Sequence, residues 1–267
     1  MAQGRRFERD YGKLAEDLAG WIAGYVRGAG FAKVVLGVSG GVDSAVSVAL
    51  AVKALGAGNV HALLLPHAES DPDSETDGRL VCEQLKITSE RVDITPYCAP
   101  LLEKIPSDAR VRRGNVKARV RMILLFDRSS AIPALVLGTG NKTEALLGYT
   151  TLHGDDACGL NPLAEVYKTE VWELAKTLGL PEKVIVKTPS ADLWPEQTDE
   201  GELGMRYLQA DEILYDFAEL GLDRESLVAA GHDPAVVEHL LGIVKRNAFK
   251  CRGPAAPPAY RNAGSKG

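Results

Sequence analysis

The sequence has 267 residues, with 31 lysines and arginines against 36 aspartates and glutamates, which gives a formal net charge of −5. Apolar residues make up 45% and charged residues 25% of the chain, as in folded globular proteins, which argues against wholesale disorder. The acidic balance argues against a general nucleic-acid-binding protein, and no apolar run reaches the roughly 18 residues of a transmembrane helix.

The N-terminus and the cysteines indicate the cellular setting. The first residues, MAQGRRFERDYGK, are basic but lack the apolar core of a secretory signal, so we expect a cytoplasmic protein. The four cysteines are widely spaced and form no CxxC pair, which predicts free thiols rather than a disulfide framework or a zinc site. They are Cys82, Cys98, Cys158 and Cys251.

Short apolar strands alternate with helices along the first half of the chain. The predicted strands are residues 33–38, 60–65, 91–94 and 133–137. The predicted helices are residues 10–27, 45–55, 74–85 and 115–129, and residues 67–75 are predicted to form a loop. This alternation predicts an α/β fold with a doubly wound, mostly parallel sheet flanked by helices. Such sheets bind ligands at the carboxyl ends of their strands.

The second half of the chain is more helical. Helices are predicted at residues 168–178, 203–220 and 234–250, which gives the fold a helical C-terminal portion. No composition shift or linker divides the chain, so we expect one domain over residues 1–252. Residues 253–267, rich in proline, glycine and alanine, are expected to form a mobile tail.

The segment SGGVDS at residues 39–44 lies between a predicted strand and a predicted helix. Its glycines allow a sharp turn close to an anion, and the helix N-terminus offers unpaired N–H groups, which predicts a pyrophosphate cradle. The segment matches neither GxxxxGK[ST] nor GxGxxG. Asp43 would repel phosphate unless it holds Mg²⁺. The alternative is a strand–turn–helix junction with an N-cap serine.

The SGGxDS segment resembles the loop of the ATP pyrophosphatases. Further motifs follow it: GNVKARVRM at 114–122, GTGNKTEALLGYTTLHGD at 138–155, NPL at 161–163, VYKTEVWELA at 166–175 and PSADLWPEQTDE at 189–200. In sequence and in order they resemble the motifs of the ammonia-dependent NAD synthetases, a family of ATP pyrophosphatases, and the resemblance covers about residues 10 to 255. The resemblance implies a Rossmann-like fold of the adenine nucleotide alpha hydrolase type.

The resemblance also implies residues for ATP, with ATP as a co-substrate, and for Mg²⁺. The implied ATP-binding residues are Gly37, Val38, Ser39, Gly40, Gly41, Val42, Asp43, Ser44, Thr139, Lys168 and Ser190. Asp43 and Glu144 are the implied magnesium ligands. Three of these residues also have an alternative, purely structural explanation: Glu144 as a first-turn acid of a helix, Lys168 as a solvated charge and Ser190 as a turn serine.

Asp43, Lys168 and Asp155 are the implied catalytic residues. Lys168 would neutralise charge on the leaving pyrophosphate. Asp155 would hold ammonium or accept its proton, and its alternative role is that of a residue in a Gly-Asp turn.

The implied deamido-NAD site has five positions, and three depart from the usual family text. The positions are Arg119, Leu152, Gly159, Phe249 and Lys250. Leu152, Gly159 and Phe249 stand where lysine, aspartate and histidine are usual. In the family this site uses both subunits of a homodimer, so we expect a homodimer. Arg119 also belongs to a basic cluster, whose alternative role is a solvated helix face or a nucleic-acid patch. The cluster is Arg112, Arg113, Lys117, Arg119 and Arg121.

The implied reaction adenylates the nicotinate carboxylate of deamido-NAD with ATP and amidates the adenylate with ammonia, giving NAD, AMP and pyrophosphate. About 30 residues precede the first predicted strand, too few for a glutaminase domain. The alternatives are another ATP pyrophosphatase, such as a tRNA thiolase or a GMP synthetase, and a non-catalytic adenine-nucleotide sensor. We expect neither a nucleic-acid nor a membrane partner.

Overall fold

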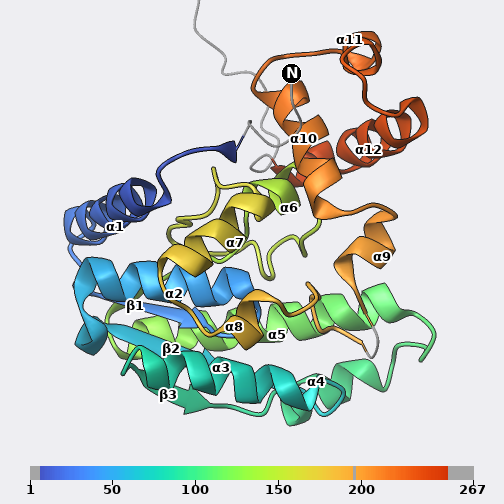
Figure 1. Cartoon of the computed structure of the whole chain (residues 1–267). Coiled ribbons are helices and arrows are strands. Elements are labelled where there is room, and N and C mark those ends of the chain that lie inside the picture. Colours follow the sequence, from blue (N-terminus) through green and yellow to red (C-terminus); the bar gives the residue numbers. More distant parts are fainter. Residues whose placement is uncertain (1–6, 195–196, 252–267) are drawn as a thin grey trace, which may run out of the picture.

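A parallel sheet of four strands lies at the centre of the computed structural model, which describes residues 7–194 and 197–251 (Figure 1). The strands are β1 (Lys33–Gly37), β2 (Val60–Leu64), β3 (Thr88–Arg91) and β4 (Ala134–Val136), in the spatial order β3-β2-β1-β4. All three pairings are parallel. The predicted doubly wound α/β fold is therefore confirmed.

The strand order reverses between β1 and β4. The chain builds outward from β1 to β2 and β3, then returns to place β4 on the other side of β1. Val35 lies opposite His61 in β2 and opposite Val136 in β4. The carboxyl ends of β1 and β4 therefore form the switch point at which open α/β sheets bind their ligands.

Helices cover both faces of the sheet because the strands β1, β2 and β4 are mostly apolar on both sides. Val34 and Leu36 of β1 face a core with α1 (Tyr11–Gly28), α2 (Val42–Leu55) and α3 (Pro72–Gln84). Val35 faces the opposite core, which contains α4 (Thr95–Leu102) and α5 (Arg110–Ala131). This alternation follows the period of two along a strand.

The second half of the chain adds a helical cap with its own core. Its elements are α6 (Lys142–Leu147), α7 (Lys168–Thr177), α8 (Glu182–Ile185), α9 (Asp199–Leu203), α10 (Tyr207–Ala218), α11 (Arg224–Ala229), α12 (Pro234–Asn247) and the 3₁₀ turn η3 (Ala248–Cys251). Tyr207, Ile213 and Val237 are fully buried in this core. In Figure 1, α10, α11 and α12 lie together beyond α6 and α7, away from the sheet.

The structure corrects several predicted boundaries. The third strand was predicted at residues 91–94 but lies at Thr88–Arg91. It is a polar edge strand, whereas Ile94 is the buried residue that precedes α4. The predicted helix 203–220 is wrong at its start, since α9 ends at Leu203 and α10 begins at Tyr207. The short helices α4, α6, α8 and α11 were not predicted.

Among residues 7–194 and 197–251, no helix is both long and apolar enough to cross a membrane. The expected tail at 253–267 lies outside the described residues, as does residue 252, the predicted end of the domain. The single domain and the cytoplasmic location stay predictions.

Candidate active site

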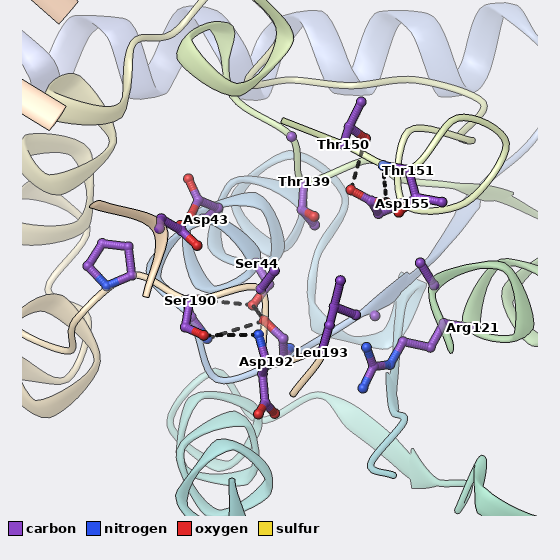
Figure 2. Close-up of a pocket in the computed structure, with 18 of the residues that line it drawn as sticks. Asp43, Ser44, Arg121, Thr139, Thr150, Thr151, Asp155, Ser190, Asp192 and Leu193 are labelled. Atoms are coloured by element: carbon purple, nitrogen blue, oxygen red, sulfur yellow. Dashed lines mark hydrogen bonds between the residues drawn. The ribbon is translucent and has the colours of Figure 1, made fainter. Parts of the chain in front are cut away.

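A cavity of about 1440 Å³ opens at the carboxyl ends of β1 and β4. Its walls come from the loops that follow these strands, from α5 and α12, and from the segment before α9. Figure 2 shows Asp43, Ser44, Thr139 and Ser190 around this space. The cavity is large enough for a nucleotide and a second substrate.

The loop between β1 and α2 is tied together by its own serines. The Ser39 amide donates to Ser44 Oγ at 3.2 Å, and Ser44 Oγ donates to the Gly41 carbonyl at 2.9 Å. The N-cap of α2 is Gly41, with no side-chain cap, so the predicted alternative of an N-cap serine does not describe this junction. The uncapped N-terminus leaves amide N–H groups available for an anion.

The loop also lies directly against α3. Gly40 has a φ of +81°, and a Cβ on it would lie 2.3 Å from the Ser74 carbonyl oxygen and 3.0 Å from Asp77 Cβ. No side chain fits there. Gly40 therefore allows both the turn of the loop and the close approach of α3.

Lys168, at the start of α7, forms an ion pair with Asp43, at the start of α2. The lysine Nζ lies 4.0 Å from Glu144 Oε1, and the other Asp43 oxygen accepts a hydrogen bond from Asn141 Nδ2 at 2.9 Å. Burial opposes the charge of Lys168, but the negative charges of Asp43 and Glu144 outweigh it and raise the pKa of Lys168. The structure thus brings together three predicted site residues.

Glu144 caps α6 and also lies close to Lys168. Its Oε2 accepts from the Asn141 amide at 3.0 Å, and the Glu144 amide donates to Asn141 Oδ1 at 2.9 Å, so the two form a capping box on α6. Burial, and then the charge of Asp43, raise the pKa of the Glu144 carboxyl above its usual range. Glu144 therefore has the predicted role of a first-turn acid of α6. Its other oxygen, Oε1, lies on the side of Lys168 and Asp43.

Asp211 of α10 fixes the starts of α6 and α7. It is fully buried, accepts from Thr143 Oγ1 at 2.5 Å and accepts from the Thr169 amide at 2.8 Å. The Lys168 amide donates to Thr143 Oγ1 at 2.9 Å. This network sets the position of Lys168 relative to Glu144.

Thr139, Ser190, Asp155 and Lys250 also line the cavity. The Ser190 hydroxyl accepts from the Asp192 amide at 3.0 Å, which is a turn contact. Asp155 accepts from Thr150 Oγ1 at 2.9 Å and from the Thr151 amide at 2.8 Å. The turn role is therefore present for both Ser190 and Asp155.

Four of the five implied deamido-NAD residues do not line this cavity. They are Arg119, Leu152, Gly159 and Phe249. Arg119 is exposed on α5 and donates to the Leu152 carbonyl at 3.1 Å, and Phe249 is also exposed. Lys250, which does line the cavity, donates to the carbonyls of Gly148 and Thr150.

Sequence reasoning did not select Asn141, Arg121 or Asp211 as site residues. Asn141 is fully buried, and its position before a short helix was a readable N-cap signal. Arg121 lines the cavity and donates to the Leu65 carbonyl at 3.1 Å. Asp211 had no local signal, because its partners are 42 and 68 residues away.

The family model described as NAD synthase matches residues 14–254. The NH(3)-dependent NAD(+) synthetase of Trichlorobacter lovleyi is 46% identical over 237 residues, 89% of this chain and 87% of that protein. The protein of the same name from Wolinella succinogenes is 47% identical, over 84% of this chain and 87% of its own.

Two solved structures resemble the fold across nearly the whole chain. The NMN synthetase from Francisella tularensis has a TM-score of 0.81 and 30% identity, and the comparison covers 94% of this chain and all of that one. The NH3-dependent NAD synthetase from Campylobacter jejuni, solved with a nitrate ion, has a TM-score of 0.80 and 33% identity at the same coverage.

Proposed function

The chain belongs to the NAD synthase family, and from this premise we propose how its cavity joins ammonia to a nicotinate carboxylate. The activity is that of an ammonia-dependent NAD synthetase, a ligase that forms a C–N bond with ATP as a substrate. The observation that carries the proposal is the contact of the buried Lys168 with the partly exposed Asp43 and Glu144, beside the glycine loop at the switch point.

ATP binds with its phosphates on the loop of residues 39–44, where the α2 N-terminus favours an anion. Asp43 and Glu144 would hold Mg²⁺. Their hard oxygens suit this ion, and Asp43 lies in the first turn of α2 without capping it. Among the described residues no group of three or more His, Cys, Asp or Glu forms a metal site, so phosphate oxygens and water would complete the coordination. When bound, the ion would offset the negative charge of the triphosphate.

The nicotinate carboxylate of deamido-NAD attacks the α-phosphorus of ATP. The bond from that phosphorus to the β-bridging oxygen breaks, and pyrophosphate leaves. Lys168 lies where it can offset the charge that develops on the leaving group. The resulting adenylate is a better electrophile than a carboxylate, because AMP is a good leaving group. Thr139 and Ser190 line the cavity and would orient the nucleotide.

Ammonia then attacks the carbonyl carbon of the adenylate, loses a proton and displaces AMP. Asp155 faces the same cavity and would hold ammonium or accept this proton. Its two hydrogen bonds to the Thr150–Thr151 segment keep its carboxylate in one orientation. The nitrogen donor is free ammonia, as in the relatives named for it.

A second copy of the chain would complete the dinucleotide site along α5. Ile123 is 58% and Phe126 40% exposed, and both lie on the helix face of Arg119, four and seven residues along. Exposed apolar side chains on one face favour a protein partner. A partner covering them would reach Arg119 and Leu152, which are joined by a hydrogen bond.

The test is NAD formation by the purified chain with ATP, Mg²⁺, deamido-NAD and ammonium. We expect NAD, AMP and pyrophosphate in equal amounts, and little NAD when ammonia-free glutamine replaces ammonium. ATP turnover without NAD would refute the proposal. A parallel reaction with nicotinate mononucleotide covers the alternative suggested by the Francisella tularensis NMN synthetase. Faster turnover of nicotinate mononucleotide than of deamido-NAD would indicate that the mononucleotide is the substrate.

A further inference from the structure

A buried carboxylate on α3 lies immediately behind the glycine loop. Asp77 is 1% exposed, and its Cβ would be 3.0 Å from a Cβ on Gly40. Burial opposes its ionisation, but ion pairs with Lys183 and Lys187 outweigh burial and lower the pKa of Asp77. Asp77 is therefore charged at neutral pH, and it holds cations next to the loop.

The two lysines that meet Asp77 differ in exposure. Each has its Nζ 2.9 Å from one carboxylate oxygen. Lys183 is 52% exposed and also contacts Asp73, whereas Lys187 is 23% exposed. Lys183 divides its charge between Asp73 and Asp77 on the exposed side, whereas Lys187 is the less exposed partner of Asp77.

Lys187 faces the same cavity as the glycine loop. Lys187 and Asp77 line the same cavity as Ser39 and Ser44. The ammonium group of Lys187 donates to Asp77 Oδ2 at 2.9 Å and to Ser74 Oγ at 3.4 Å. An ammonium group has three N–H donors, so one is left for a ligand.

We propose that Lys187 binds the pyrophosphate portion of ATP from the α3 side of the loop and that Asp77 positions it there. Lys168 approaches from α7 and is engaged by Asp43 and Glu144. The leaving group therefore meets separate positive charges from two elements. This assignment deepens the proposed function and rests on its ATP chemistry.

A purely structural role for Lys187 would be to neutralise Asp77, and a double variant separates the two roles. Lys187→Met leaves Asp77 with one partner and is expected to lower both the melting temperature and pyrophosphate affinity. Asp77→Asn combined with Lys187→Met removes both charges. The double variant should recover most of the melting temperature but not the affinity, because the cation is still missing.

The measurement is calorimetric titration of Mg²⁺-pyrophosphate into the full chain, with thermal melts of each variant. Hydrogen bonds to charged groups predict a loss of about 10- to 100-fold in affinity for the double variant. Lys176→Met, which removes an exposed lysine paired with Glu173, should bind as the wild type does. Affinity of the double variant within about twofold of the wild type would overturn the proposal.

The proposal about Lys187 and the proposed function can fail separately. Pyrophosphate binding is measured without deamido-NAD or ammonia, and NAD formation is measured on the wild type. If the wild type makes NAD and the double variant keeps its pyrophosphate affinity, only the role of Lys187 is refuted. If the wild type binds pyrophosphate but makes no NAD, the proposed function is refuted.

Discussion

Replacing Gly40 by alanine tests whether the loop and α3 must touch. The φ of +81° at Gly40 costs an alanine about 1–2 kcal/mol. The added Cβ would also lie 2.3 Å from the Ser74 carbonyl oxygen, which is backbone and cannot rotate away. Relieving such overpacking typically costs a further ~1–3 kcal/mol. Gly40→Ala should therefore destabilise the chain by about 2–5 kcal/mol.

Gly30→Ala is the matched control, because Gly30 has a φ of +82° and a Cβ added to it would meet no neighbouring atom within 4 Å. It should lose only the backbone contribution of about 1–2 kcal/mol. Urea denaturation of both variants gives the difference, and each kcal/mol also lowers the melting temperature by about 2–4 °C. Gly40→Ala should also weaken ATP binding, while Gly30→Ala should not. Equal destabilisation by both substitutions would refute the reasoning about contact with α3.

Further outcomes are expected at the metal site, the α5 face and α10. Glu144→Gln can keep the capping contact through its amide oxygen, so the melting temperature should change little. Pyrophosphate release in a single turnover should fall sharply for this variant and for Asp43→Asn. Near-normal release with a lowered melting temperature would instead favour the capping role. Ile123→Glu should shift the sedimentation of the chain toward that of a monomer, whereas Leu220→Glu, which changes another exposed apolar residue, should not. A wild-type chain that is a stable and fully active monomer would contradict the proposed dimer. Burial raises the pKa of Asp211 to about 6, above the ~4 of an unfolded aspartate, so its charged form is disfavoured in the fold. The contribution of Asp211 to stability should therefore fall as the pH rises from about 4 to 6. Asp211→Asn should remove this contribution, so the difference in melting temperature between the variant and the wild type should change over this pH range; a constant difference would contradict the reasoning.

Sequence reasoning located the parts of the fold that are apolar on both faces. The strands β1, β2 and β4 were predicted to within two residues, because each is a short apolar run bounded by glycine or proline. The strand β3, with the sequence TSER, lies at the sheet edge and carries no apolar pattern. The helix α6 has only 6 residues, too few to show a helical period.

The candidate site was predictable as separate loops but not as a set of contacts. The strand–glycine–helix pattern at residues 39–44 is local, so it could be read directly. The contacts of Asp43 with Asn141 and Lys168 join residues 98 and 125 positions apart. Nothing local in the sequence encodes these pairs, since they depend on β4 returning beside β1 and on α7 packing against α2.

The buried Asp211 has a consequence for how the chain matures during synthesis. Domains form as units while the chain emerges from the N-terminus. The glycine loop, α6 and Lys168 are all made well before α10, yet Asp211 of α10 is the residue that ties the start of α6 to the start of α7. A nascent chain that has released only its first 200 or so residues therefore has all the loops of the sheet but lacks the contacts of Asp211 with Thr143 and Thr169. Competence to bind ATP should appear late and abruptly in translation, after α10 has left the ribosome and packed onto the helical cap.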